Sequence, residues 1–332
     1  SKTNGSNGSA ENLSTDRHIP RFSLSEQRPE IDAPWEPSAK LLLLDETQGS
    51  GLKYRMQMPH IALFLGGLGS LVGARLIKLL IDDLKRLPHP LKCLLLDSDS
   101  PPAGIDPRNF KSLGTHGYGT NPWNGLERFR PLRSQVFNAI RSRYEACLNF
   151  PSDPLVPVEH GARQGTRITI LGGGGGTSGA IMEQVLTLVR TLIHKKRIAH
   201  PQVECVLLGA DIAVNSSDRT VEREQAQIIP QTVAVNLMNM LSNYAQTGWL
   251  TEEAHDGTQF QVRKSERVDS ITLVDHRSDL FEFNTAKEFA ESLAADLRTL
   301  WFTQISSFVH GRYADNTGCG PAGRGQIEQH PH

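Results

Sequence analysis

Continuous apolar runs of strand length alternate along this chain with longer segments whose apolar residues recur at helical spacing. HIALFLGG is followed by SLVGARLIKLLIDDLKRL, and RITILGG is followed by SGAIMEQVLTLVRTLIHKK. LKCLLLDSD, VECVLLGAD and SITLVDH are further apolar runs. Apolar strands between amphipathic helices predict a parallel sheet that is covered on both faces. We therefore expect an α/β fold with a Rossmann-like, mostly parallel sheet.

The composition argues against several classes of protein. The chain has 35 basic and 36 acidic side chains, whereas nucleic-acid binders normally carry a basic excess. No apolar run approaches the roughly 20 residues that span a bilayer, and the first residues lack the order of a signal peptide. The four cysteines lie far apart, which favours neither a disulfide framework nor a zinc site and indicates a cytoplasmic location.

Three loops at the carboxyl ends of the predicted strands are unusual, and the first is LGGLGSLVGA. Glycine lets backbone N–H groups approach a phosphate, and the helix that follows offers its positive end. Gly66, Gly67, Gly69 and Gly73 lie in this stretch. The spacing of the last three glycines also suits a dinucleotide site, so both interpretations stay open at this loop.

The second loop, LLLDSDSPP, places Asp97 and Asp99 at the end of a strand. Carboxylates there can bind magnesium, accept hydrogen bonds from a ribose, or simply cap the strand. The third loop holds five consecutive glycines, residues 172–176, followed by Thr177 and Ser178. A glycine run between a strand and a helix can form a nest of N–H donors for phosphate oxygens. Two such loops on neighbouring strands suit a triphosphate better than a dinucleotide.

These segments resemble the tubulin/FtsZ superfamily, including its divergent bacterial branch. GGGGGTSGA is similar to the glycine signature of that superfamily, with the order of Gly176 and Thr177 swapped. LFLGGLGSLVGARL resembles its first nucleotide loop, LLLDSDSPP its acidic segment, and LGTHGYGTNPWNG its Gly-x-Gly-Ala-Gly-Asn-Pro loop. QTVAVNLMNMLSNYAQ resembles its central helix, in which Asn236 would recognise the guanine edge.

The resemblance implies a protein that binds GTP or GDP with Mg²⁺. Asp97 and Asp99 are the expected metal ligands. The residues expected to bind the nucleotide are Gly66, Gly67, Gly69, Ser70, Asp97, Asp99, Gly117, Gly119, Asn121, Gly173, Gly174, Gly175, Gly176, Thr177, Ser178, Gly179 and Asn236.

The resemblance also implies head-to-tail self-association into filaments, with hydrolysis at the subunit interface. In the superfamily the loop after the central helix supplies acidic residues to the neighbouring subunit. That loop here is TGWLTEEAHDGTQF, which lacks a clear Asn-x-Asp-x-x-Asp pattern. Glu252, Glu253 and Asp256 are the catalytic candidates, and a solvated acidic turn is the competing interpretation.

Five segments are expected along the chain. Residues 1–35 form a disordered leader, 36–224 the nucleotide-binding domain, 225–248 the central helix, 249–312 a reduced second domain, and 313–332 a flexible tail. Two alternative functions remain open. One is an NAD(P)-dependent oxidoreductase of the Rossmann type, and the other is a scaffold that binds nucleotide without hydrolysing it. We expect no nucleic-acid partner and no membrane span.

Overall fold

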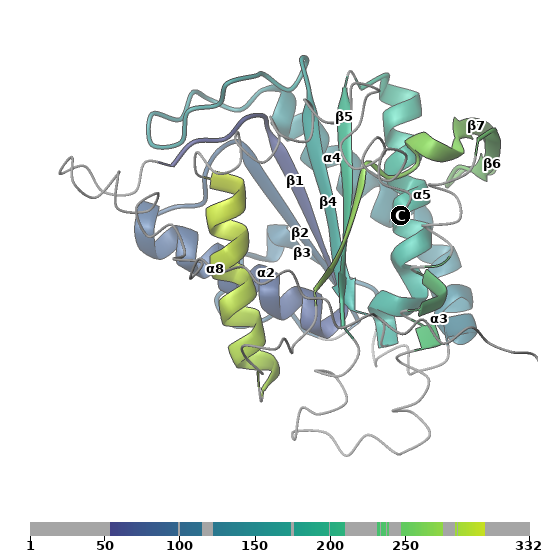
Figure 1. Cartoon of the computed structure of the whole chain (residues 1–332), viewed down its shortest axis with the longest axis horizontal. Coiled ribbons are helices and arrows are strands. Elements are labelled where there is room, and N and C mark those ends of the chain that lie inside the picture. Colours follow the sequence, from purple (N-terminus) through teal and green to yellow (C-terminus); the bar gives the residue numbers. More distant parts are fainter. Residues whose placement is uncertain are drawn as a thin grey trace, which may run out of the picture. The chain divides into compact units, whose positions relative to one another are not determined.

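The computed structural model describes residues 54–98, 100–114, 122–173, 176–198, 200–209, 231–232, 234–236, 238, 247–274, 283 and 285–302. These residues all lie in one unit, Ser50–His332, built on a six-stranded sheet (Figure 1). The strands of this sheet are β1 (His60–Leu65), β2 (Leu91–Asp97), β3 (Phe110–Ser112), β4 (Thr166–Gly173), β5 (Pro201–Leu208) and β8 (Ser270–Val274). Their order is β3-β2-β1-β4-β5-β8, and every pairing is parallel. The predicted α/β fold is confirmed.

Helices cover both faces of the sheet. Those with described bounds are α2 (Gly66–Leu84), α3 (Pro122–Phe129), α4 (Arg133–Leu148), α5 (Gly176–Lys196) and α8 (Ala286–Phe302), with 3₁₀ turns at Pro107–Asn109, Arg130–Leu132 and Lys264–Glu266. Pro131 lies in the 3₁₀ turn between α3 and α4, where the helix is interrupted because proline lacks the N–H that a continuous helix requires.

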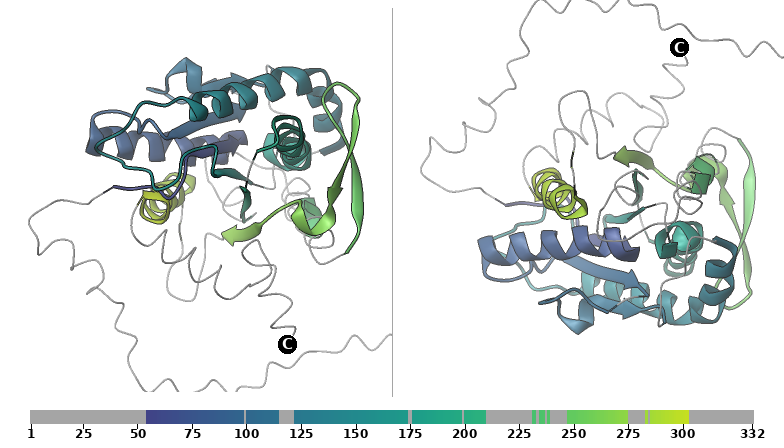
Figure 2. Two further views of the ribbon diagram at one scale, coloured as in Figure 1. Left: turned by 90° about the horizontal axis from the view of Figure 1, so that it is seen from above. Right: turned by 90° about the horizontal axis from the view of Figure 1, so that it is seen from below.

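Side chains of the central strands alternate between two cores. Ile61 and Leu63 pack in one core with residues of α4 and α5, whereas Ala62 and Phe64 pack in the other with residues of α2 and α8. Successive strand residues point to opposite faces, so a strand that is apolar at every position must be covered on both sides. Figure 2 shows α2 and α8 side by side on one of these faces.

The sheet continues past the predicted start of the second domain at residue 249. β8 pairs in parallel with β5, so the intervening chain is a crossover connection. Helical residues 231–232, 234–236 and 238, within the segment predicted as a central helix, belong to this connection. An apolar pattern predicts a strand without showing which sheet the strand joins. The domain boundaries therefore stay predictions. β8 and α8 are parts of the same α/β layers as the strands and helices before residue 249.

A two-stranded antiparallel hairpin precedes β8. It consists of β6 (Trp249–Glu253) and β7 (Gln259–Arg263), and we did not predict it. Its contacts fix it against the carboxyl-terminal part of α5: His194 stacks on Phe260 with ring centroids 5.0 Å apart, and Lys195 forms an ion pair with Asp256. The hairpin thus lies at the end of α5 that is remote from the glycine turn (Figure 1).

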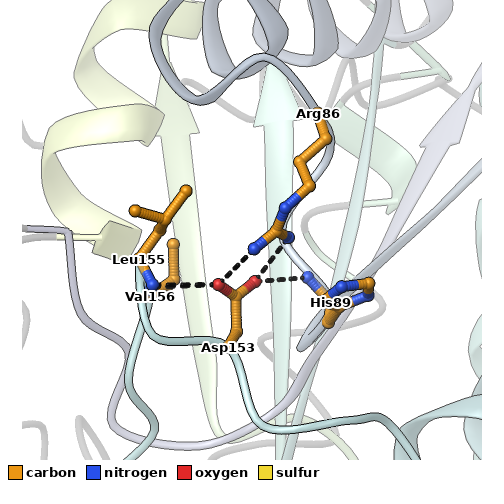
Figure 3. Close-up of polar contacts among 5 residues, drawn as sticks. All are labelled: Arg86, His89, Asp153, Leu155 and Val156. Carbon is orange, nitrogen blue, oxygen red and sulfur yellow. Dashed lines mark hydrogen bonds and ion pairs between the residues drawn. The ribbon is translucent and has the colours of Figure 1, made fainter.

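A buried carboxylate ties the chain before β4 to the connection between α2 and β2 (Figure 3). The side chain of Asp153 is 0% exposed and accepts hydrogen bonds from both terminal nitrogens of Arg86, at 2.8 and 2.6 Å. The backbone N–H groups of His89, Leu155 and Val156 donate to the same carboxylate at 3.0, 3.1 and 3.3 Å. Five donors around one carboxylate fix the path of residues 149–165.

Candidate nucleotide site at the carboxyl edge of the sheet

The order of the strands reverses its direction between β1 and β4. From β1 the chain proceeds to β2 and β3 on one side, and β4, β5 and β8 follow on the other. In open α/β sheets, the crevice at such a reversal, outside the carboxyl ends of the strands, is the usual place for a ligand. The two glycine turns identified in the sequence are the turns that follow β1 and β4.

The first turn has no residue between strand and helix. β1 ends at Leu65, and α2 begins at Gly66, whose φ is +69°. A Cβ at Gly66 would lie 2.9 Å from the backbone nitrogen of Ser178, and a Cβ at Gly69 would lie 3.0 Å from the carbonyl oxygen of Leu171. Glycine is therefore required where α2 passes the chain of β4 and α5.

The second turn packs directly on the first. β4 ends at Gly173, and α5 begins at Gly176 with φ +51°. A Cβ at Gly172 would lie 3.0 Å from the Cβ atoms of both Leu65 and Ser178. The amino-terminal ends of α2 and α5 consequently meet at one place, as the sequence predicted for two turns on neighbouring strands.

The starts of α2 and α5 both offer backbone N–H groups to a ligand. The first residues of a helix have amides with no intrahelical acceptor, which here include residues 66–68, 176 and 177. No side chain caps the start of α2, and neither helix has an acidic residue in its first turn. Gly67 is exposed, and a Cβ there would approach no atom closer than the Asp97 Oδ2, at 3.9 Å. This geometry suits an anion, because the positive ends of two helix dipoles meet there.

Asp97 brings a buried carboxylate to the same place. It is 4% exposed, and its Oδ1 accepts a hydrogen bond from the Ser98 N–H at 2.8 Å. The hydroxyl oxygens of Ser98 and Thr177 are 2.8 Å apart, which connects the end of β2 to the start of α5. A carboxylate beside an anion site is stabilised when a divalent cation bridges the two charges. The N–H groups at the two helix starts together with the Asp97 carboxylate therefore fit an anion and a cation bound side by side.

Asn236 and Ser70, two of the predicted residues, are both buried. Asn236 is 8% exposed, and its Nδ2 donates to the carbonyl oxygen of Gly179 at 3.1 Å, which places it beside the first turn of α5. Ser70 is 2% exposed, and its hydroxyl lacks a hydrogen-bond partner within the described part of the chain. The remaining predicted residues, Asp99, Gly117, Gly119, Asn121, Gly174 and Gly175, lie outside the described residues.

The three predicted catalytic carboxylates lie on the β6–β7 hairpin and each contacts a cation of this chain. Glu252 is 5% exposed, and its Oε1 accepts from the Nε of Arg267 at 2.5 Å. Glu253 pairs with Arg133 at 3.3 Å, and Asp256 pairs with Lys195. Hydrogen bonds from Lys195 and Thr258 lower the pKa of Asp256 below its ordinary range. Only Glu253 and Asp256 have exposed side chains, so these two are accessible to another molecule.

The sequence analysis missed two residues of the site. Ser98 was part of a quoted segment, but its hydroxyl contact to Thr177 joins positions 79 residues apart, and no local pattern shows such a contact. Gly172 was noted in the glycine run without a role, and its close approach to Leu65 depends on the pairing of β1 with β4.

The described residues contain no group of three or more His, Cys, Asp or Glu side chains that could hold a metal ion. None of their helices is long and apolar enough to cross a membrane.

The sequence matches no protein-family model and, at a significant level, no curated protein. Solved structures similar to this one include CetZ from Methanosaeta thermophila strain DSM 6194, with a TM-score of 0.45, 14% identity, and coverage of 73% of this chain and 53% of that one. The Clostridium botulinum phage c-st TubZ has a TM-score of 0.39 and 10% identity, with coverage of 74% and 60%. A GDP-bound monomer of CetZ1 from Haloferax volcanii has a TM-score of 0.42 and 14% identity, with coverage of 72% and 58%.

The chain spans little more than half the length of these three proteins. At this level of identity the similarity concerns the fold alone, and function has to be argued from the site itself.

Proposed function

We propose that this protein binds GTP or GDP with Mg²⁺ at the carboxyl edge of its sheet, in the cytoplasm, as a tubulin/FtsZ-like protein. The observation that carries the proposal is the direct contact between two glycine turns, each opening a helix that has no acidic first turn. One turn alone suits a diphosphate, whereas two opposed turns surround a longer phosphate chain from two sides. The resemblance of the sequence motifs to the tubulin/FtsZ superfamily suggests that the ligand is a guanine nucleotide.

Each part of the nucleotide has candidate partners in this arrangement. The backbone amides of residues 66–68, 176 and 177 would donate to phosphate oxygens. Asp97, together with Asp99 outside the described residues, would hold Mg²⁺, which neutralises charge on the phosphates. Asn236 would accept from the guanine N–H groups through its Oδ1, since its Nδ2 already bonds to Gly179.

Hydrolysis by the hairpin carboxylates would require a second molecule. Asp256 pairs with Lys195, and α5 extends from that residue back to the glycine turn. A helix of this length covers about 30 Å, so Asp256 cannot reach a nucleotide bound at the other end of α5. Glu253 and Asp256 are accessible and would act on the nucleotide of a neighbouring subunit. Head-to-tail association of this kind generates an open filament.

Binding is tested by substituting the one exposed glycine of the first turn. Gly67→Glu places a negative charge among the donors, and Gly67→Gln has nearly the same size without the charge. We expect Gly67→Glu to weaken GTP binding about tenfold relative to Gly67→Gln, the effect of one charge at about 6 Å in partly screened surroundings. Isothermal titration calorimetry measures both affinities. Equal affinities in the two variants would contradict binding at this turn.

The identity of the nucleotide separates the proposal from its alternatives. Acid extraction of the purified protein, followed by ion-exchange chromatography, should release guanine nucleotide. NAD(P) in the extract would favour a Rossmann-type oxidoreductase. Turnover is examined separately: if neighbouring subunits supply the carboxylates, phosphate release per molecule should rise with protein concentration, in parallel with light scattering. A scaffold that binds GTP without hydrolysing it would release no phosphate at any concentration.

A further inference from the structure

A cavity lies at the end of α5 that is remote from the glycine turns. It has a volume of about 390 Å³ and is bounded by the carboxyl-terminal part of α5, the start of β5 and the β6–β7 hairpin. Arg190, Trp249 and Phe260 are among its lining residues. This volume is within the range that binds small molecules, roughly 300–1,000 Å³. Nothing in the proposed nucleotide site involves these residues.

The guanidinium of Arg190 is the feature that suggests a ligand. Arg190 is 5% exposed, and its Nε donates to the carbonyl oxygen of Arg267 at 2.5 Å. Its Nη2 is buried and has no hydrogen-bond partner among the described residues, and it forms an ion pair with Asp269 only at 3.9 Å. That Asp269 oxygen already accepts from the Val203 N–H at 2.7 Å. Burial lowers the pKa of Arg190, as expected when the surroundings compensate the charge only in part.

A buried donor without an acceptor is uncommon, because each unsatisfied polar group costs free energy. A guanidinium presents its terminal nitrogens as a planar fork that matches a carboxylate or a phosphate. An acid group in the cavity would supply the missing acceptor to Arg190 and would balance its charge better than the distant Asp269 does.

The other walls suit a flat apolar group. The ring of Phe260 stacks on His194, and Trp249 is 60% exposed with the Arg263 guanidinium 5.4 Å from its ring. An aromatic side chain of the hairpin that remains this exposed has apolar surface to bury on binding. Arg263 pairs with Glu266 at 3.4 Å, whereas Arg190 pairs with Asp269 only at 3.9 Å.

We propose that this cavity binds a small aromatic acid, whose acid group hydrogen-bonds to Arg190 and whose ring packs against Trp249 and Phe260. The cavity combines one buried cationic donor with apolar and aromatic side chains, which is the pairing that such a molecule requires, although Glu266 and Asp269 also line it. An acidic side chain of a partner protein would satisfy Arg190 but would leave most of the cavity volume unfilled.

The test compares phenylacetate with phenylacetamide, which has the same shape and no charge, by isothermal titration calorimetry on the full chain. Phenylacetate should bind at one saturable site, at least about tenfold more tightly than the amide, since charge-assisted bonds are roughly twice as strong as neutral ones. Phenyl phosphate in the same titration distinguishes a preference for carboxylate from one for phosphate; tighter binding of either acid than of the amide supports the site. Equal affinities for acid and amide, or no saturation of either acid in the millimolar range, would overturn the proposal.

Three variants locate the binding. Arg190→Met should abolish the difference between the acid and the amide, and Trp249→Ala should weaken both ligands several-fold. Trp249 is exposed on the hairpin, so this variant keeps the test valid even if Arg190→Met fails to fold. Arg141→Gln removes an arginine of α4 that does not line the cavity and should leave both affinities unchanged. Unaltered binding in Trp249→Ala would place the acid elsewhere and refute the assignment.

Discussion

Substitution of Asp153 tests how strongly one buried carboxylate organises the chain before β4. Asp153→Asn keeps the size of the side chain, removes its charge, and turns an NH₂ group toward donors that need an acceptor. Breaking a buried ion pair on one side costs about 3–5 kcal/mol. Because the Arg86 side chain is 34% exposed and can be hydrated after the substitution, we expect a loss of about 2–4 kcal/mol here.

The pH dependence gives the same experiment a second readout. Burial alone would raise the pKa of Asp153, but hydrogen bonds from Arg86 and from the backbone of His89 and Leu155 outweigh it and lower this pKa from 3.8 to about 2. A carboxyl whose pKa is lower in the folded state stabilises the fold above the unfolded pKa, and this stabilisation is lost as pH falls toward the folded pKa. The shift corresponds to about 2 kcal/mol at neutral pH, less some screening at Arg86. Roughly half should remain near pH 3 and little at pH 2.

Urea unfolding at pH 7 and at several values between pH 5 and pH 3 measures both effects. Asp106→Asn is the control, since Asp106 also accepts hydrogen bonds from the side chain of one arginine, Arg108, but on the surface. We expect only a small change of the urea midpoint in that variant. A midpoint for Asp153→Asn equal to that of the wild type at pH 7, or a difference that does not shrink on acidification, would refute the reasoning.

Gly66→Ala should destabilise the fold by about 1–3 kcal/mol, because φ is +69° and the new Cβ would lie 2.9 Å from the Ser178 nitrogen. Gly67→Ala should not destabilise the fold, and the urea midpoints of the two variants test this difference. Glu253→Gln combined with Asp256→Asn should slow GTP turnover at least about tenfold without changing GTP affinity, and phosphate release alongside calorimetry checks this. Burial raises the pKa of Cys93, Cys147 and Cys205 to about 12. In a Cys319→Ser variant, a thiol-specific reagent should therefore modify these three thiols slowly in the native protein and rapidly in urea.

Strands β1, β2, β4, β5 and β8 could be predicted because their burial follows directly from residue type, whereas the three-residue edge strand β3 was not predicted. β1 is buried at all six positions, and every one of them except His60 is apolar. β6 was missed for the opposite reason. Its sequence is WLTEE, and its one fully buried position is Glu252, which is paired with Arg267. A hydrophobic pattern cannot reveal a strand whose inward-facing residue is charged, since the partner that makes its burial possible lies 15 residues away.

The candidate site was predictable in its location but not in its contacts. Glycine turns after two strands place a site at the carboxyl edge once the strands are known to be parallel. The hydrogen bond between Ser98 and Thr177 and the bond from Asn236 to Gly179 depend on how three segments meet in space. The crossover between β5 and β8 likewise depends on strand pairing, which a single sequence does not specify.

Glycines in this site satisfy two separate requirements that a sequence motif merges into one. Gly66, Gly69 and Gly172 face protein atoms at 2.9–3.0 Å, so the packing of α2, β4 and α5 excludes a side chain there whether or not a nucleotide binds. Gly67 is exposed and has space for a Cβ, so packing does not require glycine at this position. If phosphate approaches the start of α2, Gly67 is the position where the ligand, rather than the fold, restricts the side chain. The two requirements are separated if a large neutral residue at Gly67 weakens GTP binding and leaves stability unchanged. If such a residue changes neither GTP binding nor stability, packing is the sole reason for the glycines of the first turn.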